Sequence, residues 1–266
     1  MGPPPAGKKP VTGHTRTFVL AVDRAVYWFS KHWLAVLNSM AAIYVGLPIL
    51  APVLMAVGAT RPGQMIYTLY RPLCHQKASA SLFLFGEQYA YPREMAGTDL
   101  RSIDAYLDQL PGYSDVPLEN WLAFSAADSR FTGNSVMGYK IALCIRDIGI
   151  YGFVLVGGLL YGLLARRRKI SPLPFWLFLI IGMGPIGLDG FSQLFGYLAT
   201  PLDGSAPVGL AALIARIFPL RESTPFLRFF TGAWFGLMTI WLLYPHLQQA
   251  MTEMEQMLEA KLSRVK

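Results

Sequence analysis

The hydrophobic pattern divides the chain into long apolar runs separated by polar segments. Four runs reach the ~20 residues that a bilayer core requires, namely residues 33–57, 136–165, 174–198 and 226–244. A further apolar run, residues 81–91, is too short to cross a bilayer and is expected to be re-entrant or interfacial. The pattern therefore predicts an all-α, polytopic integral membrane protein with about four transmembrane helices.

The segments between these runs define the predicted organisation. Residues 1–32 are expected to form a cytoplasmic tail with an interfacial helix, and 33–57 the first transmembrane helix. A cleaved signal peptide is the alternative for 33–57, but this run is too long and begins too far from Met1. Residues 58–135 are expected to form an extracytoplasmic region, 136–244 a three-helix transmembrane region and 245–266 a cytoplasmic amphipathic helix.

The extracytoplasmic region is acidic and contains local structural signals. A short helix is expected to begin at Ser102 and to end at the sequence Leu110-Pro111-Gly112-Tyr113. Three aromatic residues further along, Trp121, Phe124 and Phe131, indicate that this region packs against another part of the protein. We therefore do not expect a flexible linker.

Composition supports the assignment to the membrane. The chain is 53% hydrophobic and 15% charged, with a mean hydropathy of +0.38, whereas soluble domains carry roughly 25% charged residues. Residues 92–136 contain seven acidic and three basic side chains, so this region has a net charge of −4 while the whole chain has +7. The positive excess lies in the two tails and in Arg166–Lys169, which is typical of cytoplasmic loops and does not favour nucleic-acid binding.

The positive-inside rule gives one consistent orientation for the four spans. Basic residues in both tails and in the 166–169 run place the N- and C-termini on the cytoplasmic side of a cell membrane. The acidic region and the 199–225 loop are then extracytoplasmic. This orientation predicts that four polar clusters, in the segments 74–76, 144–147, 189–193 and 228–231, meet in one site at the outer end of the bundle.

The sequence Cys144-Ile145-Arg146-Asp147 is the most informative of these clusters. Charged groups beside lipid are costly unless they find partners, so they indicate a site. If residues 136–165 form one helix, Lys140, Cys144, Asp147 and Tyr151 share a face and Arg146 points nearly the opposite way. The helix would then present a thiol and a carboxylate to one neighbour and a positive charge to another.

The order and spacing of the motifs resemble a bacterial and archaeal membrane family known as domain of unknown function 2085. The resemblance covers about residues 73–243. The family has no established activity, so the resemblance implies none for this chain. In this family a cysteine stands where this chain has Asp147, and the acidic region looks like an insertion. The resemblance rests on these motifs: Cys74-His75-Gln76, the segment 144–152, Asp189-Gly190 with Gln193, and Arg228 with Thr231-Gly232.

The first hypothesis for the polar cluster is a metal site formed by Cys74, His75, Cys144 and Asp147. Two thiolates, an imidazole and a carboxylate suit zinc, or else iron or copper. The cysteine that the family carries at position 147 would give a Cys₃His set. Because Cys74 and His75 are adjacent, binding of one ion by both is sterically awkward. The alternatives are a Cys74–Cys144 disulfide, including a redox-active one, and two reduced thiols without a role.

Arg146 and Asp189 form a second notable pair. The favoured interpretation is a buried ion pair between adjacent helices. The alternative is an anion or proton site, in which Arg146 or Arg228 holds a substrate carboxylate or phosphate and Asp189 acts as a base. The remaining polar candidates for this cluster are Gln76, Tyr151, Gln193 and Thr231.

Three classes of function remain open at this stage. The leading hypothesis is a metal-binding or redox-active membrane protein. The second is a structural or accessory subunit of a larger membrane complex, in which the cluster is a disulfide and ion-pair staple. A transporter comes third, because four spans are few for a transporter without oligomerisation and no inverted repeat is visible in the sequence. The expected partners are the lipid bilayer and either other membrane subunits or a second copy of the chain, and the sequence does not decide whether the protein is an enzyme.

Overall fold

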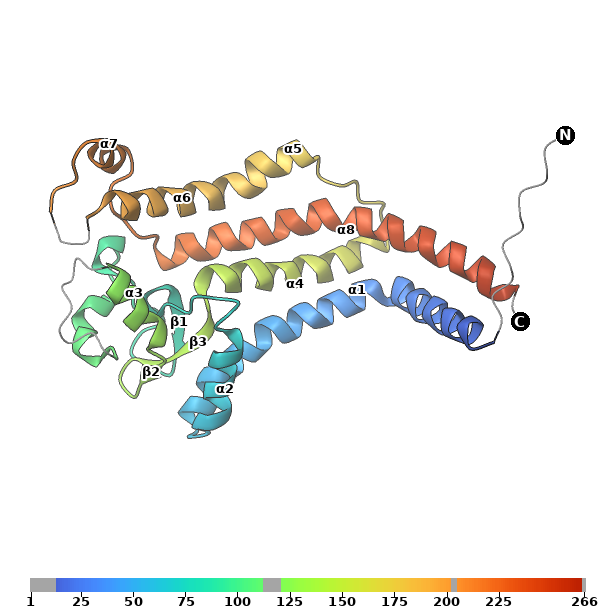
Figure 1. Cartoon of the computed structure of the whole chain (residues 1–266), viewed down its shortest axis with the longest axis horizontal. Coiled ribbons are helices and arrows are strands. Elements are labelled where there is room, and N and C mark those ends of the chain that lie inside the picture. The colour runs from blue at the N-terminus through green and yellow to red at the C-terminus, as the bar shows by residue number, and fades with distance from the viewer. Residues whose placement is uncertain (1–12, 112–120, 202–204, 265–266) are drawn as a thin grey trace.

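The computed structural model describes residues 13–111, 121–201 and 205–264. Within these ranges, four helices are long and apolar enough to cross a membrane. They are α1 (Gly13–Ala56), α4 (Ile145–Ala165), the helix that runs through α5 and α6 (Phe175–Ala199), and α8 (Pro225–Ser263). They lie side by side with their axes roughly aligned (Figure 1). This arrangement confirms the prediction of a polytopic helical membrane protein.

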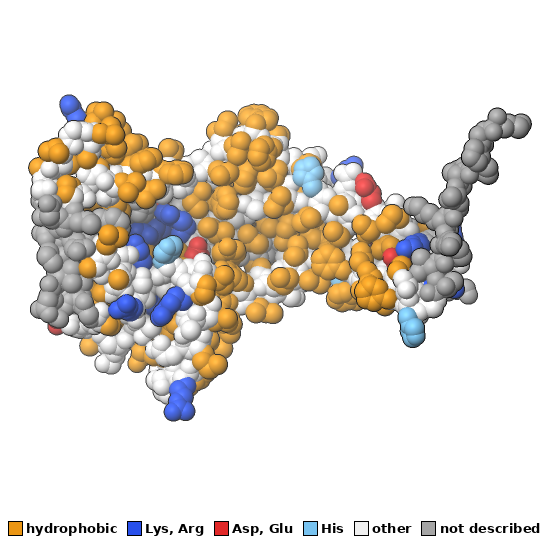
Figure 2. Space-filling model, in the orientation of Figure 1, with side chains coloured by type: hydrophobic (Ala, Val, Ile, Leu, Met, Phe, Trp, Pro, Cys, Tyr) orange, Lys and Arg blue, Asp and Glu red, His pale blue; other side chains and the backbone are white. Residues whose placement is uncertain are grey.

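The bundle has two distinct ends, which we name by their contents (Figure 1). The sheet end carries a small β-sheet with α2, α3 and α7, and the tail end carries the start of α1 and the end of α8. Hydrophobic side chains cover much of the middle of the molecule, while charged side chains gather towards the two ends (Figure 2). This surface is typical of a protein that spans a bilayer.

Both terminal helices extend beyond the predicted spans. The expected interfacial segment 18–30 is continuous with α1, and the expected amphipathic segment after Pro245 is continuous with α8. The two extensions contact each other through ion pairs, Lys261 with Asp23 at 2.6 Å and Lys31 with Glu255 at 3.8 Å. Residues 1–12 of the predicted tail, with Lys8 and Lys9, lie outside the described residues.

Helices α4 and α8 form the closest helix pair of the bundle. Glycines on both helices allow the two backbones to touch, as small residues do in membrane interfaces. A Cβ atom added at Gly149 of α4 would lie 2.6 Å from the carbonyl oxygen of Phe229. Cβ atoms at Gly232 and Gly236 of α8 would clash with the α4 backbone. The glycines therefore set the spacing that brings the start of α4 against the start of α8.

The third span contains the sequence Gly182-Met183-Gly184-Pro185, which predicts a break or bend in the helix just before Asp189. After α5 (Phe175–Leu177) the chain forms a π-helical stretch, Phe178–Met183, and α6 (Gly184–Ala199) then begins with Pro185 in its first turn. Trp234 of α8 donates its indole N–H to the carbonyl oxygen of Ile181 at 2.6 Å. This bond gives a partner to a carbonyl in the irregular stretch, which a membrane interior requires.

A three-stranded antiparallel sheet corrects two predictions. The sheet has the order β1-β3-β2, with β1 at Ser81–Leu84, β2 at Gly133–Asn134 and β3 at Gly138–Cys144. The 81–91 run, predicted to be re-entrant or interfacial, contains an edge strand. The 136–165 run is a strand followed by a helix and not a single helix. A short strand of mostly apolar residues cannot be distinguished from a helix by periodicity, which explains why β3 was taken as part of the following helix.

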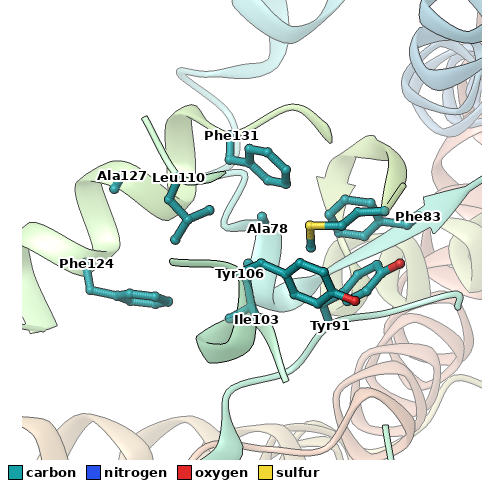
Figure 3. Packing of buried hydrophobic residues seen from close by; sticks show 10 residues of the cluster. Ala78, Phe83, Tyr91, Ile103, Tyr106, Leu110, Phe124, Ala127 and Phe131 are labelled. Carbon is teal, nitrogen blue, oxygen red and sulfur yellow. The ribbon is translucent and has the colours of Figure 1, made fainter. Parts of the chain in front are cut away.

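The rest of the sheet end is compact and has its own hydrophobic core (Figure 3). It includes α2 (Thr60–Tyr70), α3 (Trp121–Arg130), α7 (Leu210–Ile217) and 3₁₀ turns at Ala78–Ala80, Glu94–Ala96 and Ile103–Gln109. The last turn confirms the helix predicted at Ser102, whose hydroxyl accepts the N–H of Asp104 at 3.0 Å; Gly112 and Tyr113 lie outside the described residues. The packing predicted for this region is confirmed for Phe124 and Phe131, while the side chain of Trp121 lies outside the described part of the structure. The core cluster comprises Ala78, Phe83, Tyr91, Ile103, Tyr106, Leu110, Phe124, Ala127, Phe131 and Met137.

Candidate functional site

Cys74, Cys144 and Asp147 meet at the sheet end, where the membrane helices begin. Cys74 follows α2, Cys144 is the last residue of β3 and the N-cap of α4, and Asp147 lies in the first turn of α4. The pairing of Ser81 with Cys144 anchors the end of β3 to β1. One ligand atom from each of the three side chains lies within 4.8 Å of the other two. We call these three residues the thiol–carboxylate group.

The two thiols of this group are in direct contact and unequal. The main-chain N–H of Cys144 donates to Cys74 Sγ at 3.3 Å. The Cys144 side chain also donates to Cys74, which lowers the pKa of the Cys74 thiol although burial opposes this shift. The pKa of Cys144 is held well above its ordinary value, because its thiol donates that hydrogen bond to Cys74 and because it is shielded from water. Cys74 is therefore the first of the pair to become a thiolate, the form that binds metals.

His75 and Gln76 point to different environments from Cys74. His75 is exposed and does not join the thiol–carboxylate group. Gln76 is buried, and its side-chain amide donates to the carbonyl oxygen of Tyr67 at 2.8 Å. Its φ of +50° is uncommon for a residue other than glycine. Gln76 therefore holds the backbone turn behind Cys74, and it is not placed to bind a metal.

Lys140 does not share a helix face with Cys144, Asp147 and Tyr151, because it lies in β3. Its ammonium group is completely buried and donates to the carbonyl oxygens of Ser129, at 3.0 Å, and Gln76. Burial lowers the pKa of Lys140 to about 8. Lys140 thus ties β3 to the turn at Gln76, which directly follows Cys74 and His75 in the chain.

Asp147 and Tyr151 are one helical turn apart on α4, as predicted. The Tyr151 ring packs against Tyr44 of α1, with ring centroids 4.5 Å apart. Tyr44 also accepts, through its carbonyl oxygen, the hydroxyl hydrogen bond of Tyr70 at 3.0 Å. These aromatic side chains therefore connect α1, α2 and α4 next to the thiol–carboxylate group.

A second polar group forms around Asp189 of α6, which is buried between three helices. Its carboxylate makes ion pairs with Arg146 of α4 and, at 3.2 Å, with Arg221. It also accepts hydrogen bonds from Ser223 and, at 3.3 Å, from Gln193. The ion pair predicted between Arg146 and Asp189 is thus present in the structure. We call these five residues the Asp189 hub.

Arg228 joins the hub from the first turn of α8. Its guanidinium group contacts Gln193 Oε1 at 3.4 Å and pairs with Glu222 at 3.0 Å. Glu222 in turn accepts the hydroxyl hydrogen bond of Tyr197. Thr231 bonds to no side chain of this network, because its hydroxyl donates to main-chain carbonyls of its own helix, those of Leu227 at 2.8 Å and Arg228 at 3.3 Å.

The four clusters predicted to form one site are divided into two adjacent groups. Asp147 faces Cys74 and Cys144, while the preceding Arg146 faces Asp189. Consecutive helical positions differ by ~100°, so neighbouring residues reach opposite partners. The helix therefore separates a thiol–carboxylate group from a guanidinium–carboxylate group, in agreement with the predicted direction of Arg146.

Sequence reasoning missed Arg221, Glu222 and Ser223, which supply much of the hub. They lie in the loop before Thr224, whose hydroxyl caps α8 by accepting the N–H of Leu227 at 3.1 Å. Charged residues that directly precede a helix cap at a membrane end provide the signal that would have found them. Their position beside the cap places them next to Arg228.

Comparison with known proteins confirms the resemblance to a membrane family. Residues 134–242 match the family described as "Predicted membrane protein (DUF2085)". The match includes the motifs on α4, α6 and α8 but not Cys74-His75-Gln76, so it begins later than the resemblance inferred from the motifs. The uncharacterized protein MJ1492 of Methanocaldococcus jannaschii is 31% identical over 110 residues, which are 41% of this chain and 55% of the relative. No solved structure matches the chain.

Proposed function

We propose that this membrane protein binds a transition-metal ion, zinc in the first instance, through Cys74, Cys144 and Asp147. The observation that carries the proposal is the convergence of two thiols and a carboxylate from separate segments within 4.8 Å. Thiolate and carboxylate oxygen are both zinc ligands. Iron and copper are the second choices, because they also accept thiolate ligands.

The surroundings of the three residues support this proposal. Cys74 is buried, and the hydrogen bond from Cys144 lowers the pKa of its thiol, which favours the thiolate that binds metals. Cys144 and Asp147 lie at the first turn of α4, whose four N-terminal N–H groups favour negative charge. Once both thiols have lost their protons to a bound divalent cation, the three donors carry negative charge that the cation neutralises.

Three protein ligands leave one position of a tetrahedral ion open, as in catalytic zinc sites. In such a site the ion supplies Lewis acidity or a bound water of lowered pKa. His75 is adjacent in sequence but exposed, so we do not include it among the ligands of the proposed site. Asp147 takes the position of the cysteine in the resembling family and preserves the charge of that ligand.

The proposal includes an orientation. The tail end carries the basic run 166–169 and the starting turns of α1, so we place it in the cytoplasm of a cell with the sheet end outside. The metal site then faces the extracytoplasmic side of the plasma membrane. A reporter enzyme that is active only in the cytoplasm tests this orientation. It should be active when fused to the C-terminus and inactive when inserted at the 97–101 turn.

A second candidate is an accessory subunit of a larger membrane complex. The observation in its favour is α7, an apolar helix at the rim of the sheet end with exposed Leu210, Leu213 and Ile217. In that function the Asp189 hub and the two thiols would staple the helices together. Purification under mild detergent distinguishes the candidates, since a subunit retains partner proteins and a self-sufficient site retains only its ion.

Titration with Co²⁺ tests the metal proposal spectroscopically, because thiolate ligands give cobalt an intense near-ultraviolet charge-transfer band. The band should appear in the wild type at one equivalent of Co²⁺ and disappear in Cys74→Ser. His75→Ala is the matched control at the neighbouring position and should keep the band. A wild type without the band, or one in which Cys74→Ser retains it, contradicts the proposal.

A further inference from the structure

A cavity of about 1000 Å³ lies at the tail end, far from the thiol–carboxylate group. It is formed where the end of α4, the link between α4 and α5, and the extension of α8 meet α1. In Figure 1 this is the region where the link passes beside α8, at the end of the bundle opposite the sheet. Trp241 of α8 fixes the link by donating its indole N–H to the Ser171 carbonyl at 3.1 Å.

The charged side chains on the cavity wall are mostly basic. Arg166, Arg168 and Lys169 all line it, while Glu253 is its single acidic lining residue. Glu253 is already engaged, since it accepts a hydrogen bond from Gln249 at 3.0 Å. The cavity therefore has an excess of two positive charges.

In the described part of the chain, these three cations have no acidic partner of the kind that Lys31 and Lys261 have. Among the described residues, neither Arg166, Arg168 nor Lys169 has an acidic oxygen within 4.0 Å. By contrast, Lys31 and Lys261 on the helical extensions each pair with a carboxylate. Three unpaired cations around one cavity attract an anion more strongly than a single exposed lysine would.

Part of the remaining wall is apolar and continues into the membrane span. Uncharged polar side chains of the α8 extension line another part, namely Gln248, Gln249, Thr252 and Gln256. Leu34 of α1, Tyr161 and Gly162 of α4 and Pro245 of α8 line the side that leads towards the bilayer core. The basic residues begin directly after Ala165, where α4 ends. The wall thus changes from apolar to cationic at the depth where the acyl chains of a lipid give way to its phosphate.

We propose that this cavity binds an anionic phospholipid of the cytoplasmic leaflet. The phosphate headgroup contacts Arg166, Arg168 and Lys169, and the upper part of an acyl chain lies against Leu34 and Tyr161. A free phosphate or a nucleotide would use the basic residues alone and would leave the apolar wall exposed. The combination of both walls selects a lipid as the occupant.

The run itself provides a matched control. Arg167 lies between Arg166 and Arg168 but does not line the cavity. Replacing Arg167 or Arg168 by glutamine removes the same charge from adjacent, exposed positions, and neither change is expected to affect folding. A difference between the two variants therefore reports on the cavity and not on the overall charge of the protein.

The test measures binding of phosphatidylglycerol and of phosphatidylcholine to the purified full-length protein by native mass spectrometry. The wild type and Arg167→Gln should bind phosphatidylglycerol equally and in preference to phosphatidylcholine. Arg168→Gln should bind it about fivefold more weakly, and the triple variant R166Q/R168Q/K169Q about a hundredfold, from ~1 kcal/mol for each basic residue.

Three results would overturn this proposal. They are equal binding by Arg167→Gln and Arg168→Gln, equal binding of the two lipids by the wild type, and displacement of phosphatidylglycerol by inorganic phosphate in the same concentration range. The last result would identify the cavity as a site for soluble phosphate. Because the thiol–carboxylate group lies at the other end of the bundle, none of these results bears on the metal proposal.

Discussion

Cys144 donates its main-chain N–H to the sulfur of Cys74 at 3.3 Å, although the two residues are 70 positions apart in the chain. This contact exists because β3 pairs with β1 and leads directly into α4, while α2 delivers Cys74 to the same point. The small sheet outside the membrane spans therefore positions the thiols. The helices of the bundle then add Asp147 from the first turn of α4.

Asp147 offers a direct way to alter the proposed metal site. Asp147→Asn removes the negative charge of one ligand and should weaken zinc binding by at least about tenfold. Asp147→Cys replaces oxygen by sulfur and should favour softer ions, so that Cd²⁺ gains affinity relative to Zn²⁺. Competitive titration with a chromophoric chelator measures both. Identical affinities in the wild type and both variants would exclude Asp147 as a ligand.

The Asp189 hub is predicted to be structural. Asp189→Asn would leave Arg146 and Arg221 without their shared counter-charge in a buried setting, which should lower the free energy of unfolding by about 3 kcal/mol. Thermal unfolding in detergent, followed by circular dichroism, measures this change. The control is Glu255→Gln, which removes a partly exposed carboxylate 3.8 Å from Lys31 and should leave the unfolding midpoint in place.

The same variants separate the two interpretations of Arg146 and Asp189. A structural ion pair requires that Asp189→Asn unfolds more easily than Glu255→Gln. An anion or proton site requires the opposite pattern, in which the Asp189→Asn protein stays folded with an unchanged unfolding midpoint but loses its proton- or anion-dependent activity. An unchanged midpoint in Asp189→Asn therefore contradicts the structural role.

Two glycines on α4 predict opposite responses to the same substitution. A Cβ atom at Gly149 would lie 2.6 Å from the Phe229 carbonyl oxygen, whereas one at Gly152 would meet nothing within 4 Å. Gly149→Ala should therefore push α4 and α8 apart and cost about 1–3 kcal/mol. Gly152→Ala should be neutral or stabilise by up to about 1 kcal/mol, because alanine is the better helix former. Unfolding midpoints that change equally in both variants would show that the α4–α8 contact is not as close as described.

Lys140 makes the stability of the sheet end depend on pH. Burial lowers its pKa in the folded protein from 10.5 to about 8. Between these values the unfolded chain binds the proton and the folded protein does not, so stability should rise as the pH increases from 8 to 10.5. Lys140→Met carries no titrating group and serves as the comparison. Equal slopes for the two proteins across this range would contradict the lowered pKa.

Much of the membrane region could be predicted from sequence because its signals are local. Apolar runs gave the four spans, and the Gly-Met-Gly-Pro sequence gave the irregular stretch at Phe178–Met183. The position of Arg146 opposite Asp147 also follows from helix geometry alone. The ion pair of Arg146 with Asp189 was predicted because charged groups in a membrane bundle require partners.

The sheet end was less predictable because its contacts are long-range. Segment 138–144 is a short, mostly apolar strand, and its pattern does not separate it from the helix that follows. Reading both as one helix placed Lys140 on the wrong element and hid its contacts with Gln76 and Ser129. His75 was included as a ligand from its chemistry, whereas its exposure depends on the backbone turn at Gln76.

Metal content of the purified protein is the most direct test of the central claim. Inductively coupled plasma mass spectrometry should find close to one equivalent of zinc, or of another transition metal, in the wild type and in His75→Ala. Cys144→Ser should contain none, while keeping the circular dichroism spectrum of a folded helical protein. If the wild type holds no metal after purification without chelators and after incubation with zinc, the metal proposal is wrong. The thiol–carboxylate group would then be a structural contact between β3, α2 and α4.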